Sequence, residues 1–439
     1  MEKNTMKKRK LTIEEGLYLL LAGTALLALI LYVSFCLDNL MHSDTTAEVI
    51  LSKFLADRNE LISKEWFYST EIRVIYTQLV MVPLFKIFSS YRLVKLLSVF
   101  IYYAVLLYAW HMLTKRFTLE KKWIFLGLAL LLAPLSNEYL DMMFIGCFYT
   151  TQTICMYLVL SFVLKEKKNR KMWIREGIVL SILSVLLGMT GLRYLASLYL
   201  PMLLAFLLFP VLERDGNKKE NWQNITFSLL LTGFAGIGFL INKFYLAVQY
   251  SFDTTSEVSF VPIDEIPDRF LTSIRLMLEF MGYRQIRVVT PLGIVNAVKC
   301  LFFLAFIAMI VALFWKRMEL TGKERFLLYF FLLLFLINWY MLIFTDVLQQ
   351  YRYWLPVYVT GAVLVCVFMQ HFRPATVFQK PLLCAFLALV VLSSLYGELW
   401  QDVKYNDCAK RYAYMDFLEN NDYDCLLYTS PSPRDRTRS

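Results

Sequence analysis

The sequence is poor in charge, in histidine and in paired cysteine. Only 18% of its 439 residues are charged and 58% are hydrophobic, which excludes an ordinary soluble domain. Three histidines are too few for a histidine-rich metal site. The eight cysteines form no CxxC pair and lie mostly inside apolar runs, so they are typical of small packing residues and not of a zinc or redox centre. The sequence contains instead repeated apolar runs of about 20 residues, which predict a membrane protein with many spans.

Basic residues gather in short clusters between the apolar runs, and the formal net charge is +10. Such clusters favour the cytoplasmic side of a membrane, so they are topology signals, and no nucleic-acid partner is expected. The first apolar run, 16–37, follows a basic cluster at 7–10. It is too long for the core of a signal peptide and no small-x-small cleavage site follows it. We therefore expect an uncleaved first span with its N-terminus in the cytoplasm.

The fold class predicted for residues 1–399 is an all-α polytopic membrane domain with about eleven transmembrane helices. The expected spans are 16–37, 94–113, 123–140, 144–164, 172–190, 195–213, 223–242, 292–315, 325–344, 354–371 and 381–399.

One apolar segment does not fit this pattern. The segment from Val74 to Phe85 is short and is interrupted by Gln78 and Pro83, so an interfacial position is expected. If it does not cross, every basic cluster falls on the cytoplasmic side. The chain then has two large outer segments, 38–93 and 243–291, and both carry amphipathic helical patterns with interfacial helices expected in the first.

The end of the sequence differs in kind from the rest. Residues 425–439 contain CLLYTSPSPRD, which resembles the translation of a sequencing adapter, and we expect them to be an artefact. The alternative is a disordered tail rich in Ser, Pro and Arg. Residues 400–424 are then expected to begin a truncated extracytoplasmic segment.

The stretch MHSDTTAEV, residues 41–49, places acidic residues directly after the first span. A local explanation is helix capping, in which Asp44 or Thr45 caps a helix that begins near Thr46, with Thr45 and Glu48 spaced as a capping box. Capping does not explain why a large amphipathic outer segment follows. Asp44 is therefore also a candidate catalytic carboxylate.

A second acidic stretch, SNEYLDMM at 136–143, falls on the same side between two expected spans. Glu138 and Asp141 are three residues apart, so on a helical turn they would share a face. The alternative is a solvated loop between two short helices. Carboxylates cost less at a membrane boundary than at its centre, so both explanations stay open.

Two arginines lie at the outer boundary, Arg193 in GLRYLAS and Arg352 in QQYRYWLP. A guanidinium group binds phosphate oxygens through paired hydrogen bonds and could hold a lipid phosphate at the interface. The alternative is snorkelling beside the aromatic residues of a membrane boundary.

Together these residues match the needs of a transferase that uses a lipid-phosphate sugar. One carboxylate takes the proton from the attacking acceptor, and cations stabilise the phosphate that leaves. A transporter or lipid flippase is the main alternative, and it predicts charged or broken spans near the bilayer midplane. A polymerase or ligase of surface polysaccharide is a further alternative that would use a diphosphate-linked glycan.

The pattern resembles the GT-C superfamily of integral membrane glycosyltransferases, which includes protein O-mannosyltransferases, the lipid A aminoarabinose transferase and oligosaccharyltransferases. The matching features are the sequence HSD at 42–44 after the first span, Asp141 with Glu138 in a second outer loop, a long first outer loop and about eleven spans. The sequence departs from the O-mannosyltransferases because it lacks their paired acidic dipeptide and their His-Pro-Pro-Leu stretch.

The resemblance implies an inverting transferase that takes a sugar from a polyprenyl-phosphate donor on the outer face of the plasma membrane. Asp44 would be the general base, and Asp141 or Glu138 would assist at the acceptor or at a metal ion. Arg193 and Arg352 are our candidates for the donor phosphate, with His42 beside Asp44 as a further substrate-binding candidate. Some relatives use a divalent metal ion, so one is allowed but not required. The acceptor, whether glycan, lipid or protein, stays open.

Overall fold

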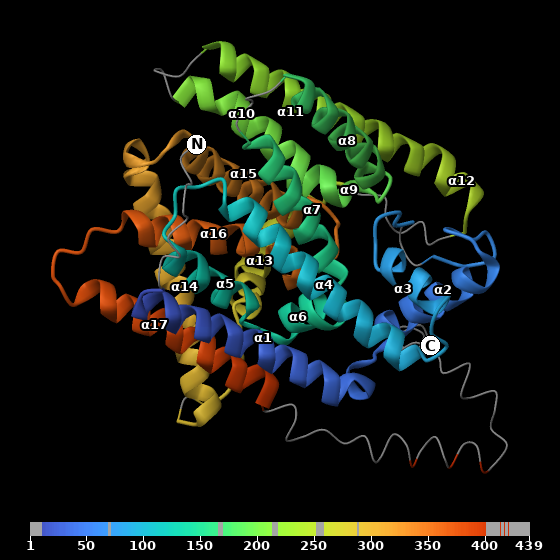
Figure 1. The fold of residues 1–439 in the computed structure, drawn as a ribbon, viewed down its shortest axis with the longest axis horizontal. Coiled ribbons are helices and arrows are strands. Elements are labelled where there is room, and N and C mark those ends of the chain that lie inside the picture. Colours follow the sequence, from blue (N-terminus) through green and yellow to red (C-terminus); the bar gives the residue numbers. More distant parts are fainter. Residues whose placement is uncertain are drawn as a thin grey trace, which may run out of the picture.

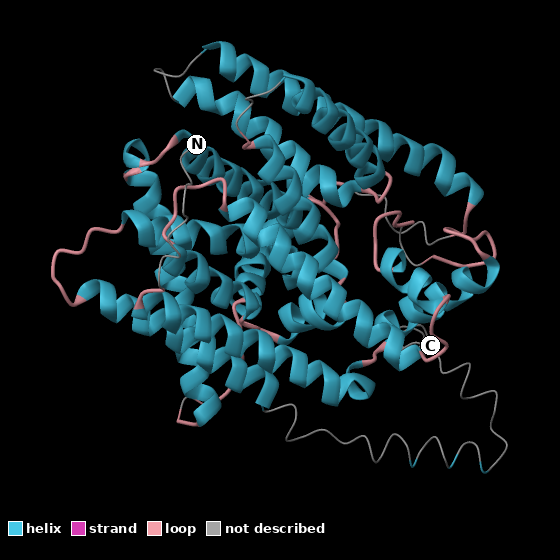
Figure 2. Ribbon diagram, viewed as in Figure 1, coloured by secondary structure: helices cyan, strands magenta, loops and turns pink. Residues whose placement is uncertain are grey.

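The computed structural model describes residues 11–68, 72–165, 170–212, 218–251, 259–287 and 289–400, together with Ala413, Phe417 and Asn420. The expected extracytoplasmic start at 400–424 and the expected artefact at 425–439 lie outside the described residues, apart from these three and Trp400. Within the described ranges the secondary structure is helical, and one isolated bridge joins Phe260 to Thr345 (Figure 2). The predicted all-α fold class is confirmed.

Eight helices of the described chain are long and apolar enough to cross a membrane, which confirms the polytopic class. They are α1 (Ile13–Leu40), α4 (Tyr91–Thr114), α9 to α10 (Leu192–Leu212), α11 to α12 (Asn221–Gln249), α14 (Pro291–Trp315), α15 (Gly322–Phe344), η6 to α16 (Tyr351–His371) and α17 to η7 (Gln379–Trp400).

The remaining expected spans are helical but do not meet that criterion singly. They are α5 (Lys121–Leu132), α7 (Phe148–Val163) and α8 (Arg170–Gly188). A ninth crossing results if α5 and the following α6–η1 helix (Asn137–Ile145) form one broken span. The count of eleven crossings stays a prediction.

The expected continuous span at 123–140 is wrong, because the helix breaks near its C-terminal end. Helix α5 ends at Leu132, and α6 (Asn137–Leu140) restarts at an angle of 104°. Pro134 explains the break, since a proline disfavours helical backbone at the residue before it. The Ser136 side chain accepts a hydrogen bond from the Tyr139 amide and so caps α6. The break places Glu138 and Asp141 in a bent segment and not inside a straight helix.

The interfacial position expected for Val74–Phe85 agrees with the helix found there. Helix α3 (Gln78–Phe85) has eight residues. At 1.5 Å per residue it is about 12 Å long, too short for a hydrocarbon core of about 30 Å. It packs against α2 (Ser43–Arg58) in a small apolar cluster of its own that includes Val49, Leu55 and Met81, beside the main bundle (Figure 1).

The main bundle has two chemically different ends. At one end Lys122 contacts Glu14 at 2.8 Å, the Glu120 amide donates to the Gln370 side-chain oxygen at 3.0 Å, and His371 contacts Glu324 at 3.1 Å. The starts of α1, α5 and α15 therefore lie with the end of α16. We call this the basic end, after the Lys- and Arg-rich loops that it carries. The opposite ends of these helices form the site end.

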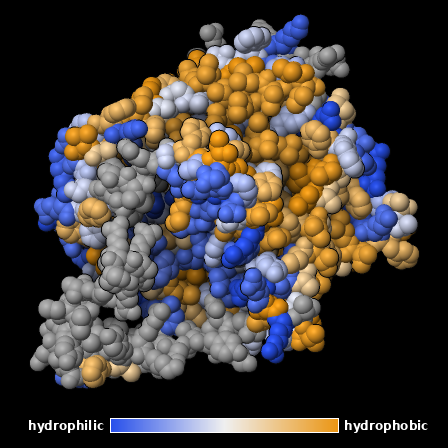
Figure 3. All heavy atoms as spheres, turned by 180° about the vertical axis from the view of Figure 1, so that it is seen from behind, coloured by the Kyte–Doolittle hydropathy of each residue, from blue (hydrophilic) through white to orange (hydrophobic). Residues whose placement is uncertain are grey.

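Large hydrophobic side chains are exposed along several of the long helices. Leu20 of α1, Ile182 of α8, Leu229 of α11 and Leu304 of α14 are all more than half exposed. Hydrophobic side chains cover much of the face seen in Figure 3, and hydrophilic ones gather near its centre and edges. Such a surface suits helices that are surrounded by lipid.

Candidate functional site

Asp44 lies in the first turn of α2, at the point where the chain leaves α1. Helix α2 begins at Ser43, earlier than the expected start near Thr46, and its N-cap residue is His42, whose side chain makes no capping hydrogen bond. The capping explanation for Asp44 and Thr45 is therefore wrong. The Asp44 carboxylate is exposed and makes no hydrogen bond or ion pair with any described residue, while the helix N-terminus favours its negative charge.

His42 joins this turn to the second acidic segment. Its Nε2 atom lies 2.9 Å from Oδ1 of Asp141, a residue 99 positions away in the sequence, and 2.9 Å from the Thr45 hydroxyl. The ring also meets Phe148 edge to face, with centroids 6.4 Å apart. The hydrogen bond that His42 donates to Asp141 raises the pKa of His42, because the carboxylate stabilises the protonated ring, and the charge of Asp44 acts in the same direction. The imidazole thus fixes Asp141 and leaves Asp44 unpaired.

Glu138 and Arg352 lie next to this pair. The half-buried Glu138 carboxylate interacts electrostatically with four nearby charged residues. The interaction with Arg352 is the strongest, followed by those with Asp141, His42 and Asp44. Arg352 comes from the 3-10 turn η6 (Tyr351–Trp354), which starts the η6–α16 helix. The structure therefore brings together Asp44, His42, Glu138, Asp141 and Arg352 from separate parts of the chain.

Lys95 and Glu48 also lie at the site, and the sequence did not predict either as a site residue. Lys95 of α4 is buried, and its ammonium group donates to the Gly146 carbonyl at 3.4 Å. Lys95 interacts electrostatically with both Asp141 and Glu48, so its positive charge partly offsets their negative charge. Glu48 of α2 accepts a hydrogen bond from the Thr77 hydroxyl at 3.1 Å, and burial raises its pKa.

The backbone that carries Asp141 is irregular. Asp141–Ile145 forms a π-helical turn, η1, and Cys147 follows with a left-handed φ of 60°. A left-handed conformation at a residue other than glycine costs free energy and is found mainly where tertiary structure requires it. π-Helical turns likewise recur at functional sites. These features point Asp141 toward His42 instead of along a regular helix.

A second group of side chains surrounds Arg193, at the start of α9. The Arg193 guanidinium lies over the Tyr149 ring at 4.7 Å. Arg73, which precedes α3, donates to the Tyr76 hydroxyl at 2.6 Å, and the charges of both arginines reach Tyr76. Tyr76 stacks on Phe148 with centroids 5.8 Å apart, and the same Phe148 meets the His42 ring. Aromatic contacts thus connect the two arginines to the His42–Asp141 pair.

An apolar groove of about 1220 Å³ is lined in part by the helix that carries Arg193. Leu192 and Leu195 line it on one side, Phe270 of α13 (Ile266–Phe280) on another, and Trp339 of α15 on a third. Phe270 stacks on Trp339 with centroids 5.5 Å apart. The groove has almost no polar lining and lies between helices that face lipid.

All six site residues predicted from the sequence lie at the site end, namely His42, Asp44, Glu138, Asp141, Arg193 and Arg352. The structure separates the two candidate phosphate ligands, because Arg352 faces Glu138 whereas Arg193 lies with Arg73. Over the part of the chain that the structure describes, no three His, Cys, Asp or Glu side chains are grouped as ligands of one metal ion.

This arrangement can perform proton transfer beside an anion. Asp44 is an available base, Asp141 is held in place, and the arginines offer hydrogen bonds to a phosphate. Comparison with protein-family models, curated proteins and solved structures gives no match to this chain. The chemistry of the site is therefore the basis for the function.

Proposed function

We propose that this protein is a membrane glycosyltransferase that transfers a sugar from a polyprenyl-phosphate donor to an acceptor, at the outer face of the membrane. The observation that supports this most is the exposed Asp44 carboxylate, which has no partner among the described residues and lies beside the His42–Asp141 pair, with Arg352 acting on the neighbouring Glu138. The GT-C resemblance of the sequence agrees with this proposal.

In the proposed reaction Asp44 removes a proton from an acceptor hydroxyl. The acceptor oxygen attacks the anomeric carbon as the bond from that carbon to the phosphate oxygen breaks, and the electron pair leaves with the phosphate. Attack from the face opposite the phosphate inverts the anomeric configuration. A positioned base contributes about 10²–10⁴-fold to the rate of such a step.

The leaving phosphate is assigned to Arg193 and Arg73. Their guanidinium groups can donate paired hydrogen bonds to phosphate oxygens as negative charge develops there. The Tyr149 hydroxyl, under Arg193, is buried and has no hydrogen-bond partner among the described residues, so it is a further available donor. The apolar groove beside Arg193 suits the polyprenyl tail, because a lipid chain there would stay in contact with the bilayer.

Glu138 and Arg352 are assigned to the acceptor side. Glu138 interacts electrostatically with Arg352, Asp141 and Asp44. A carboxylate in this position can accept hydrogen bonds from acceptor hydroxyl groups.

The experiment that tests the proposal is a donor panel. Membranes carrying the protein are incubated with labelled polyprenyl-phosphate and polyprenyl-diphosphate sugars, and loss of label from each donor is measured against empty membranes. Consumption of a monophosphate donor supports the proposal. Consumption of diphosphate donors alone would favour a polymerase or ligase.

A lipid flippase is the second candidate, and one observation favours it. Lys95 is a buried ammonium group inside the candidate span α4, and intramembrane charges often mark transport paths. In the same panel a flippase would move a labelled lipid across the membrane with the sugar–phosphate bond intact. Intact, translocated lipid would therefore replace the glycosyltransferase proposal.

A further inference from the structure

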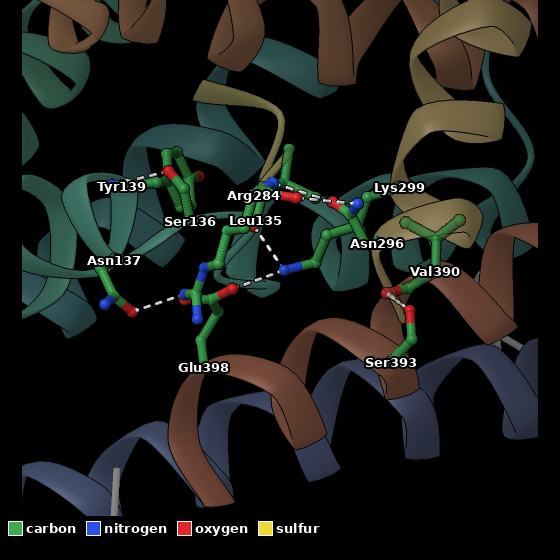
Figure 4. Close-up of polar contacts among 10 residues, drawn as sticks. All are labelled: Leu135, Ser136, Asn137, Tyr139, Arg284, Asn296, Lys299, Val390, Ser393 and Glu398. Atoms are coloured by element: carbon green, nitrogen blue, oxygen red, sulfur yellow. Dashed lines mark hydrogen bonds and ion pairs between the residues drawn. The ribbon is translucent and has the colours of Figure 1, made fainter. Parts of the chain in front are cut away.

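A second charged cluster lies next to the segment that carries Glu138 and Asp141. It takes no part in the reaction described above. Lys299 of α14 and Glu398 of η7 are each 1% exposed, and their Nζ and Oε1 atoms are 2.5 Å apart. Arg284, which follows α13, also bonds the Glu398 carboxylate. The cluster therefore joins parts of the chain that are far apart in the sequence (Figure 4).

Both cations of this cluster also bind the segment that leads into Glu138. The Lys299 ammonium donates to the Leu135 carbonyl at 2.6 Å, and the Arg284 guanidinium donates to the Asn137 side-chain oxygen at 3.0 Å. Figure 4 shows the charged groups of Lys299 and Arg284 lying between Glu398 and this segment. Leu135 and Asn137 lie on either side of Ser136, the cap of α6, so the cluster holds the bend at which α6 begins.

The surrounding backbone is shaped to admit the cluster. Gly282 has a φ of +94°, a conformation that side-chain-bearing residues rarely adopt. A Cβ at this position would overlap the Leu135 carbonyl oxygen and come within 2.5 Å of the Lys299 side chain. Asn296 exchanges two hydrogen bonds with the backbone of Arg284, at 2.9 and 3.1 Å, and so fixes where that arginine starts.

Stability alone is a weak explanation for such a cluster. The cost of removing two charges from water offsets most of their attraction, and apolar replacements of buried pairs are often neutral or stabilising. What a fixed charge cluster supplies is one defined arrangement of the groups that it binds. Here the bound groups are the backbone and side chain just before Glu138, three residues from Asp141.

We propose that Lys299, Glu398 and Arg284 are positioning residues that fix the Leu135–Asn137 segment and thereby place Glu138 and Asp141 for transfer. This inference rests on the proposed function for its catalytic consequence. The residues act through the acidic segment and need not touch the substrate. The reaction geometry, and hence kcat, should depend on them more than donor binding does.

The test uses the double variant Lys299→Met/Glu398→Leu, which removes both buried charges together. Arg284 loses its carboxylate partner in this variant but is partly exposed to solvent and keeps its contact with Asn137. We expect kcat for transfer to fall by about 100-fold, since misplacement by about 1 Å can cost that much. KM for the donor should stay the same, because Arg73 and Arg193 are not bound by the cluster. His371→Gln is the control, because it breaks the contact with the buried Glu324 at the basic end and should leave kcat unchanged.

Amide hydrogen exchange provides a readout that does not depend on activity. Amides of 133–141 should exchange faster in the double variant than in the parent or in His371→Gln, while those of α1 and α4 stay as protected. Asn137→Ala is the second variant in case the double variant fails to fold, because its side chain is exposed and it removes only the Arg284 contact. It should increase exchange of the same segment and lower kcat by a smaller factor.

The outcomes separate the two proposals. Unchanged exchange at 133–141 in both variants would overturn the positioning role, whatever the activity. Faster exchange with unchanged kcat would overturn its catalytic consequence. If the parent protein transfers no sugar, the proposed function fails, whereas faster exchange would still support the structural role of the cluster.

Discussion

At the residue scale, the site depends on a difference between two aspartates. Asp141 is bound by His42, whereas Asp44 is exposed and makes no bond with any described residue. A general base must reach its substrate with a free lone pair, so Asp44 suits that role. Asp141 is oriented by its partner and suits a supporting role.

The His42–Asp141 pair predicts how stability depends on pH. The pKa of His42 is raised above its ordinary value of 6.5, because Asp141 stabilises the charged ring. Its contribution to stability is therefore complete below pH 6.5 and is lost as pH rises through the folded pKa. We expect the Tm to fall over that upper range and His42→Gln to remove this part of the dependence. Parallel curves for the parent and the variant would contradict the pairing.

The arginine assignment predicts which variants weaken donor use. Arg193→Gln and Arg73→Gln should each lower kcat/KM about 10- to 100-fold, since a hydrogen bond to a charged group contributes about 1.5–3 kcal/mol. Arg275→Gln, an exposed arginine of α13 paired with Glu279, is the control and should leave kcat/KM unchanged. A loss in Arg352→Gln with none in Arg193→Gln would move the donor phosphate to Arg352.

Single residues were predictable to the extent that their local sequence marked them. Asp44 and Asp141 stand at the ends of apolar runs, where a charge is conspicuous. Lys95 was missed because a lysine near the start of a span resembles a boundary residue, and Arg73 because it flanks a short apolar segment. The position of Lys95 near Glu48, and that of Arg193 near the Arg73–Tyr76 pair, join segments that are distant in the sequence, so no local pattern contains them.

At the element scale, the sequence predicted where helices exist better than where they break. A continuous apolar run hid the 104° bend after α5, although Pro134 was a local signal for it. The eight-residue α3 agreed with expectation, because its length and Pro83 are both visible in the sequence. The π-helical turn η1 has no sequence signature, since tertiary contacts produce it.

The placement of α2 and α3 predicts a labelling pattern. A cysteine at Leu61, which is 79% exposed between these helices, should react with a membrane-impermeant reagent in intact cells. A cysteine at Met318, 66% exposed at the basic end, is the matched position and should react only after permeabilisation. The parent chain measures the background from native cysteines. The reverse pattern would invert the proposed orientation.

At the scale of the whole molecule, three features lie at one end of the bundle. They are the carboxylates Asp44 and Asp141, the arginines Arg73 and Arg193, and the apolar groove. The groove could not be predicted, because its walls come from 192–200, 266–271 and 336–345, which are distant in sequence. In the proposed reaction, the groove would hold the tail of a lipid-linked phosphate and the arginines its head group. It is the same end at which the sequence analysis expected the outer face.

The groove predicts a dependence on the length of the donor lipid. Ala196→Trp would fill part of the groove, so KM should rise about tenfold for a long-chain donor, because apolar contact with the chain is lost. A short-chain analogue that does not occupy the groove should be unaffected. Leu229→Trp, on the lipid-facing surface of α11, is the control and should leave both values unchanged. Equal effects on long and short donors would place the tail elsewhere.

The role of Asp44 is tested most directly by single-turnover transfer from the donor that the panel identifies, in the parent, Asp44→Asn and Asp57→Asn. Asp57 lies on the same helix, is also exposed and, among the described residues, pairs with Lys53 alone, so it is a matched carboxylate outside the site. We predict that Asp44→Asn lowers the rate of transfer about 10²–10⁴-fold with donor binding retained, and that Asp57→Asn leaves the rate unchanged. A folded Asp44→Asn protein that transfers sugar at the parental rate would contradict the assignment of Asp44 as the base.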